Sequence, residues 1–210
     1  MSEETGSFCR LWLLRHPEPE MAHAELAIGA GPVDLSRRGR AQVLRWLEVL
    51  KPVELERIAC GPQPQCHGPA RALAEARQQE ALVDARLRDQ EMGKWQGRSW
   101  QDIMRDEDAA VRTFFSEFGE SAAPGGGETL GQAVERMLQW WTELMPNVAG
   151  KQLVVVLPGA LLSGFAAAML GMRLSRSLSL NTPFGSMSMF DVFENGVRVS
   201  GWNVDALHGS

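Results

Sequence analysis

The sequence predicts an α/β fold in which helices flank a mostly parallel sheet, a three-layer sandwich that spans residues 1–210 as a single domain. Residues 11–14 and 153–157 are short, continuously apolar runs, which is the pattern of strands buried on both faces. Segments with helical periodicity lie between these runs, and a chain that alternates strands with helices folds around a parallel sheet.

The first half of the chain is expected to contain two helices and two strands. The strand at residues 11–14 is followed by a loop, and then Ser36 is a good N-cap for a helix. A second strand is expected over residues 55–60 and a loop over 61–69, after which Pro69 suits the first turn of a helix at 70–79. The apolar positions of the first helix are Val43, Leu44, Leu47 and Leu50.

The second half repeats the alternation. Residues 84–100, rich in Gly and Trp, lead into helical pieces and a flexible turn at 125–127. The strand at 153–157 is expected to open directly into an apolar helix at 158–170, and the tail at 187–202 reads as a hairpin with an Asn-Gly turn. Between the turn at 125–127 and the strand at 153–157, a further helix is expected. Its core-facing stripe consists of Leu130, Val134, Leu138, Trp141 and Met145.

Composition limits the partners. The chain has 210 residues, 44% of them hydrophobic, and a formal net charge of −5, which argues against a nucleic-acid surface. No run approaches the length that spans a bilayer, and residues 1–6 do not resemble a signal peptide, so we expect a cytoplasmic protein with no membrane partner. Cys60, Cys66 and His67 fit no common zinc spacing, so neither a metal nor another cofactor is expected.

Arg15 and His16 end the first strand, and Pro158 and Gly159 follow the later one. In open parallel sheets, ligands bind where strands end, so both pairs are expected at one edge. An Arg can clamp an anion through two donors, and a His can act as nucleophile or proton carrier. The competing interpretation is that both basic residues are simply solvated.

Five motifs in order make the chain similar to the histidine phosphatase superfamily, with its alpha-ribazole phosphatase branch looking closest. The resemblance covers nearly the whole chain and implies the phosphoglycerate mutase-like fold. The motifs are residues 11–19 (LWLLRHPEP), 35–42 (LSRRGRAQ), 86–97 (RLRDQEMGKWQG), 126–129 (GGET) and 182–186 (TPFGS).

The resemblance implies phosphoryl transfer through a phosphohistidine, with His16 as the nucleophile, Arg15 as an anion clamp and Asp89 in place of the family's acidic Glu. Two basic positions differ, because Gln65 stands where the family has a second Arg and Pro158 where it has a second His. An amide carries no charge, and Pro has no donor, so the catalytic set is incomplete.

A small anionic or phosphorylated molecule is the expected partner, and a homodimer is left open. Trp95 and Trp100 flank the segment after Asp89 and could wall a pocket for this molecule. The candidate ligand-binding residues are Gln65, Pro158, Gly159 and Trp95. Residues that could replace a lost cation are Arg71, His23 and His67.

Three functions remain open at this point. The leading one is a divergent family member with weak or lost phosphatase activity and a retained anion site at Arg15 and His16. The second is an active phosphomonoesterase that uses a phosphohistidine at His16. The third is a repurposed enzyme in which His16 and either Asp89 or Glu91 form an acid–base pair on a non-phosphorylated substrate.

Overall fold

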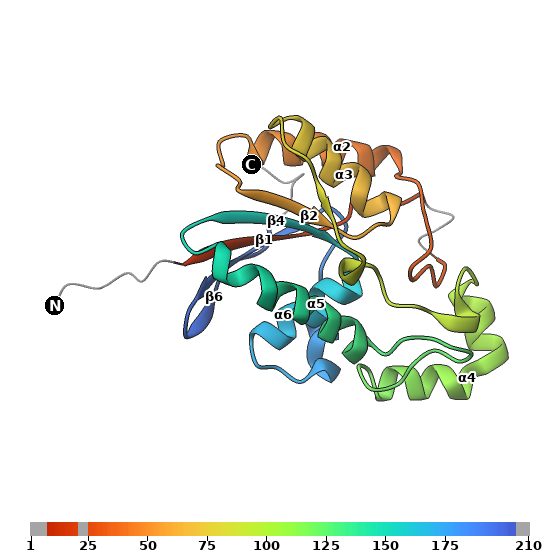
Figure 1. Cartoon of the computed structure of the whole chain (residues 1–210). Coiled ribbons are helices and arrows are strands. Elements are labelled where there is room, and N and C mark those ends of the chain that lie inside the picture. Colours follow the sequence, from red (N-terminus) through yellow and green to blue (C-terminus); the bar gives the residue numbers. More distant parts are fainter. Residues whose placement is uncertain (1–7, 21–24, 205–210) are drawn as a thin grey trace.

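A computed structural model describes residues 8–20 and 25–204, and its centre is a six-stranded sheet of order β3-β2-β4-β1-β5-β6. The first four of these strands run parallel to their neighbours, whereas β5 pairs antiparallel with both β1 and β6. The predicted α/β sandwich with a mostly parallel sheet is thus confirmed (Figure 1). The strands are β1 (Cys9–Arg15), β2 (Arg57–Cys60), β3 (Leu82–Val83), β4 (Gln152–Leu157), β5 (Met187–Phe193) and β6 (Gly196–Val204).

Helices cover both faces of the sheet. Figure 1 shows α2 and α3 on one face and α5 and α6 on the other, with α4 further out beside the strand ends. The helices are α2 (Arg37–Leu50), α3 (Pro64–Glu75), α4 (Trp100–Ser116), α5 (Leu130–Leu144) and α6 (Gly159–Met169), with 3₁₀ turns at Ala85–Leu87, Gly93–Trp95, Met145–Asn147 and Leu174–Ser179.

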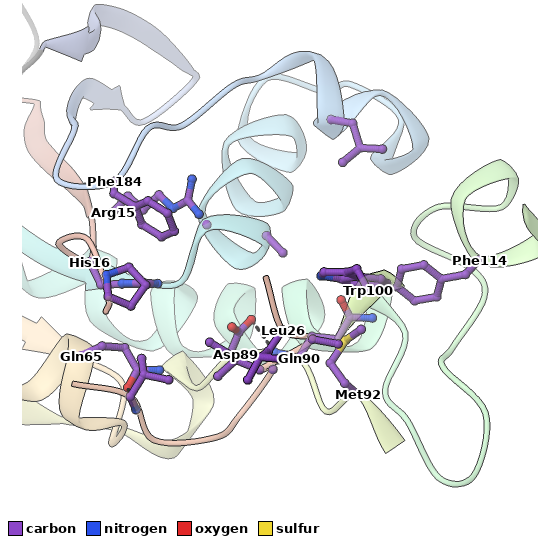
Figure 2. Close-up of a pocket in the computed structure, with 18 of the residues that line it drawn as sticks. Arg15, His16, Leu26, Gln65, Asp89, Gln90, Met92, Trp100, Phe114 and Phe184 are labelled. Atoms are coloured by element: carbon purple, nitrogen blue, oxygen red, sulfur yellow. Dashed lines mark hydrogen bonds between the residues drawn. The ribbon is translucent and has the colours of Figure 1, made fainter. Parts of the chain in front are cut away.

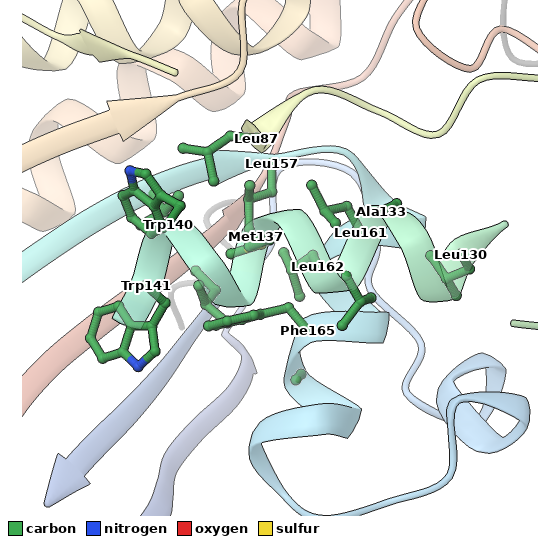
Figure 3. Packing of buried hydrophobic residues seen from close by; sticks show 14 of the residues in the cluster. Leu87, Leu130, Ala133, Met137, Trp140, Trp141, Leu157, Leu161, Leu162 and Phe165 are labelled. Atoms are coloured by element: carbon green, nitrogen blue, oxygen red, sulfur yellow. The ribbon is translucent and has the colours of Figure 1, made fainter. Parts of the chain in front are cut away.

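The central strands are apolar throughout because they have a core on each side. On β1, Leu11 and Leu13 join the cluster under α5 and α6, whereas Trp12 and Leu14 join the cluster under α2 and α3. Figure 3 shows the packing between α5 and α6, where the rings of Trp141 and Phe165 lie 6.4 Å apart between centroids. The start of α6 lies at the end of β4, because Pro158 alone separates the two elements.

Local signals set most helix starts correctly. The Ser36 hydroxyl accepts a hydrogen bond of 2.9 Å from the Gly39 N–H and caps α2, as expected. Thr129 and Gln132 form a reciprocal capping box at the start of α5. Pro158 is the residue that precedes the first turn of α6, so the helix itself begins at Gly159.

The predicted bounds of α3 were wrong. The helix begins at Pro64, which takes the first-turn position that suits proline, so Pro69 lies inside the helix rather than at its start. It ends at Glu75, four residues early, and the backbone then reaches the left-handed region at Gln78 (φ 56°). The supposed loop at 61–69 is therefore mostly the first turns of a helix that brings Gln65 toward the strand ends.

The helical pieces after residue 100 form α4, which the sequence did not resolve into one element. Its backbone leaves helical geometry at Glu107, with φ −137° and ψ 36°. The Glu107 carboxylate accepts hydrogen bonds from Trp95 Nε1 at 3.0 Å and Arg98 Nη1 at 2.5 Å. Within residues 8–20 and 25–204, no helix combines the length and apolar character that crossing a bilayer requires.

Candidate active site

His16 follows the last residue of β1 and is fixed by its backbone. Its N–H donates to the Leu157 carbonyl at 2.9 Å, which continues the pairing of β1 with the end of β4. Its Nδ1 lies 2.9 Å from the Pro17 carbonyl, an acceptor, so Nδ1 carries the proton and Nε2 keeps a free lone pair. Burial and the neighbouring Arg15 charge lower the pKa of His16 to about 4, so the ring is neutral at physiological pH.

The Arg15 side chain is held between an aromatic ring and a glycine. Its guanidinium carbon lies 3.7 Å from the centroid of Phe184, and Nη1 donates to the Thr182 carbonyl. A Cβ on Gly159 would come within 2.8 Å of Arg15 Nε, so a larger residue at this position would require the guanidinium to shift. Burial lowers the pKa of Arg15 to about 10, which still leaves it charged at neutral pH.

The loop that carries Phe184 is tied to α2. Gln42 Nε2 donates to the Phe184 carbonyl at 2.7 Å, and Trp46 Nε1 donates to the Gly185 carbonyl at 2.8 Å. Gln42 Oε1 also accepts from the Glu18 N–H at 2.8 Å, so one amide joins the segment after His16 to the Phe184 loop. Gln42 and Phe184 lie in the sequence motifs at 35–42 and 182–186, but the sequence analysis predicted no role for either residue.

Asp89 is a second titratable group of the site. Burial raises its pKa to about 7, against the opposing effects of the Gln90 N–H, which donates to Oδ1 at 2.8 Å, and of the Arg136 and Arg15 charges. Arg136 fixes the segment by donating to the Asp89 carbonyl at 3.1 Å while it pairs with Glu128 at 2.9 Å. At neutral pH, Asp89 can therefore hold or release a proton.

Gln65 uses its side chain to hold a loop. Oε1 accepts from the Val33 N–H at 3.3 Å, and Nε2 donates to the Gly31 carbonyl at 3.0 Å. The side chain is buried, and both polar atoms are thus engaged with backbone. The amide stabilises the loop around residues 28–33 and has no positive charge to offer an anion.

Pro158 is buried at the end of β4, where it precedes α6. It has neither a backbone donor nor a polar side chain. It is absent from the described residues that line the cavity, whereas the next residue, Gly159, is present.

A cavity of about 310 Å³ brings these residues together (Figure 2). Its described lining includes Arg15, His16, Gln65, Asp89 and Gly159, which the sequence predicted as site residues. Among the described lining residues, Arg15 and His16 are the only basic side chains and Asp89 is the only acidic one. Much of the remaining wall is apolar, and besides Trp100 it includes residues that were not predicted from the sequence: Phe114, Phe115, Phe118 and Leu178.

Trp95 does not line the cavity as expected. It is fully buried behind the wall, its indole N–H donates to Glu107, and its ring packs edge-on to Trp100 at 6.1 Å between centroids. A side chain with no exposed surface cannot contact a ligand, so Trp100 belongs to the aromatic wall and Trp95 supports it from behind.

The proposed replacement cations do not enter the described cavity lining. Arg71 is an exposed residue on α3 and pairs with Glu75 at 3.4 Å, and His67 is only half-buried on the same helix. His23 falls outside the described residues. Glu91, offered as an alternative acid, instead lies 3.7 Å from the Nε of Arg88.

Metal ligation has no support in the part of the chain that the structure describes. Cys60 and Cys66 are both buried, and burial raises the pKa of both thiols, which opposes formation of the thiolate that a metal binds. Over residues 8–20 and 25–204, no three His, Cys, Asp or Glu residues are grouped as metal ligands.

Comparison with known proteins supports a common origin for this arrangement. The model of the histidine phosphatase superfamily (branch 1) matches residues 11–205. The chain is 24% identical over 185 residues to the adenosylcobalamin/alpha-ribazole phosphatase of Salmonella typhimurium, covering 88% of this chain and 91% of the relative. It is 30% identical to the glucosyl-3-phosphoglycerate phosphatase of Mycolicibacterium vanbaalenii, covering 78% of this chain and 75% of that protein.

Solved structures share the fold. A putative alpha-ribazole-5'-P phosphatase from Escherichia coli superposes with a TM-score of 0.84 at 22% identity, covering 96% of this chain and 99% of that one.

Proposed function

This chain belongs to the histidine phosphatase superfamily, and we propose that it is a divergent member, resembling alpha-ribazole phosphatase, whose phosphatase activity is weak or lost and whose Arg15 and His16 retain a site for a small anion. One observation carries the proposal. Gln65, which replaces the second Arg of the family, has its amide bonded to Val33 and Gly31 and supplies no charge.

The energetic consequence follows from the chemistry of phosphoryl transfer. Charge spreads over three equatorial oxygens as the phosphoryl group moves, so catalysis depends on donors aimed at those oxygens. Loss of one such donor typically costs about 2.7–4 kcal/mol of transition-state stabilisation, or 10²–10³ in rate. Gln65 and Pro158 together replace two of these donors. Arg15 is left as the permanent cation among the described lining residues.

Two features favour a competing function, an active phosphomonoesterase. His16 has a free Nε2 for attack on phosphorus, and Asp89 can deliver a proton to a leaving oxygen at neutral pH. The same pair, facing a largely apolar cavity, also favours acid–base chemistry on a substrate without phosphate. All three functions use His16, so turnover and covalent labelling must separate them.

The test is hydrolysis of p-nitrophenyl phosphate and alpha-ribazole phosphate by purified wild-type and His16→Ala proteins. We expect kcat far below the range of about 1–10³ s⁻¹ that is typical of enzymes, and no phosphate on His16 by mass spectrometry of the intact protein. His67→Ala is the matched control, because this half-buried His is absent from the described cavity lining.

Turnover at ordinary enzyme rates that His16→Ala abolishes and His67→Ala preserves would contradict the proposal. A trapped phosphohistidine with such turnover would establish the active phosphomonoesterase instead. Stabilisation of the protein by an anion in a thermal-shift assay, lost in Arg15→Gln, is the expected sign of the retained anion site.

A further inference from the structure

The cavity has two chemically different ends. Figure 2 shows Arg15 and His16 on one side and Trp100 and Phe114 on the other, with Asp89 between them. A ligand that fills the cavity would therefore place a polar group near Arg15 and an apolar body against the aromatic residues.

The aromatic end is a packed wall with an open face. Phe114 and Phe115 meet edge-on at 5.3 Å between centroids, Phe115 and Phe118 stack at 6.2 Å, and Trp100 lies 5.8 Å from Phe115. Phe115 nevertheless keeps 45% of its surface exposed, and Leu178, on the same cavity, keeps 54%. A flat apolar molecule placed here would bury surface that the protein leaves in contact with water.

The polar end carries little positive charge. His16 is neutral, Asp89 is neutral when protonated, and Arg15 is the one permanent cation among the described lining residues. Few of its donors are open to a ligand, since Nη1 bonds to the Thr182 carbonyl and Nε is buried beside Gly159, where it has no hydrogen-bond partner. Transfer of a charged group into an apolar cavity is costly unless it is paired, and the cost rises steeply with charge. A single cation with few free donors therefore suits a ligand with one negative charge better than a ligand with two negative charges.

We infer that the cavity binds an aromatic carboxylate, with the carboxylate at Arg15 and the ring system against Trp100 and Phe115, in preference to the phosphate dianion of an equivalent monoester. The inference rests on the proposed function, because it takes the anion site as retained while phosphoryl transfer is impaired. The single cation assigns the charge of the ligand, and the aromatic wall assigns its flat, apolar shape.

The experiment compares three probes with the same ring system by isothermal titration calorimetry at pH 7: 2-naphthoate, 2-naphthyl phosphate and 2-naphthol. We expect 2-naphthoate to bind at least about tenfold more tightly than either of the others, since it alone combines the ring with a single charge. A dissociation constant for 2-naphthyl phosphate equal to or below that of 2-naphthoate would overturn the inference, and so would binding of none of the three.

Variants test the two ends separately. Phe115→Ala should weaken 2-naphthoate at least about fivefold, and Arg15→Gln should weaken it at least about tenfold. Met104→Ala is the matched control, because Met104 is an apolar residue of α4 that is 51% exposed and absent from the described cavity lining. Equal losses in Phe115→Ala and Met104→Ala would overturn the assignment of the aromatic end.

Failure of this inference and failure of the proposed function give different signals. Release of 2-naphthol from 2-naphthyl phosphate at enzyme rates, abolished in His16→Ala, would contradict the proposed loss of activity. Tight binding of 2-naphthyl phosphate without release of 2-naphthol would overturn only the preference for a carboxylate.

Discussion

The two halves of the site have diverged to different extents. The half built on β1 and the segment before the second 3₁₀ turn keeps His16, whose ring is neutral, and Asp89, whose pKa lies near neutrality. The half built on the starts of α3 and α6 has an amide at Gln65 and a proline at Pro158, where the resemblance expects cations. His16, Asp89 and the Arg15 cation are present, while the two further cations that the resemblance expects are not.

The difference teaches that the frame of the site does not require a cation at position 65 or 158. The His16 N–H bonds to the Leu157 carbonyl, and α5 packs on α6 through buried apolar residues, with no cation involved in either contact. Gln65 has found two backbone partners of its own, so the replacement leaves no buried polar group unpaired on that side chain. An uncharged amide at position 65 is thus compatible with an intact fold.

Restoring charge to the depleted half should have the largest effect on activity. Gln65→Arg is expected to raise kcat/KM for p-nitrophenyl phosphate by about 10²–10³, because one donor aimed at the developing charge is worth that much. Adding Pro158→His should raise it further, by less than the product of the single effects. Stopped assays of nitrophenolate release measure both.

Gln65→Arg should also lower the stability of the fold, since it removes the hydrogen bonds of Gln65 to Val33 and Gly31, each worth about 0.5–1.5 kcal/mol. Ala76→Arg, which adds a cation at the exposed end of α3, is the control and should leave activity unchanged. An equal gain in Ala76→Arg, or no gain in the double variant, would show that lost cations do not explain low turnover.

How far the sequence predicts this site depends on whether the deciding contacts are local. The order of the elements other than β3, the Ser36 cap and the position of Arg15 and His16 at a strand end follow from short-range patterns and were predicted. The engagement of Gln65 was not, because its partner Val33 is 32 residues away.

The aromatic wall was predicted only in part for a similar reason. Trp95 and Trp100 both follow Asp89 closely in the sequence, and the sequence does not show which of them reaches the cavity. Only the tertiary packing decides that Trp95 is enclosed while Trp100 faces the cavity. The start of α3 was misplaced because two prolines competed for the first turn, and the sequence pattern did not separate Pro64 from Pro69.

The retained half can be tested through the pH dependence of stability. The Asp89 pKa of about 7 exceeds its ordinary value of 3.8, so the folded state binds more protons than the unfolded state between these values. Stability from this group is therefore lost as pH rises from about 4 to 7 and is constant above. The charges that act on Asp89 are Arg136, Arg15 and Glu128.

Asp89→Asn removes this titration. The unfolding free energy of the variant, relative to wild type, should rise by about 4 kcal/mol between pH 4 and pH 8 in urea titrations. Asp108→Asn, an exposed carboxylate paired with Arg112, serves as the control and should differ by less than about 1 kcal/mol across the same range. A flat difference for Asp89→Asn would mean that the carboxyl is ionised normally and cannot carry a proton at neutral pH.

The junction of the two halves lies where Gly159 of α6 meets Arg15 of β1, and the smallest effect is expected there. In Gly159→Ala, a Cβ 2.8 Å from Arg15 Nε and 2.9 Å from Cζ must displace the guanidinium from the position it holds over Phe184. We expect the dissociation constant of 2-naphthoate to rise about tenfold, because the anion would then lose part of a charge-assisted contact.

Gly68→Ala is the matched control, since Gly68 lies in α3 with no neighbouring atom within 4 Å of the place that an alanine methyl group would take, and alanine is the better helix former by about 0.5–1 kcal/mol. It should raise the melting temperature and leave 2-naphthoate affinity unchanged. Unchanged affinity in Gly159→Ala as well would show that the guanidinium position in this structure is not what binds the anion.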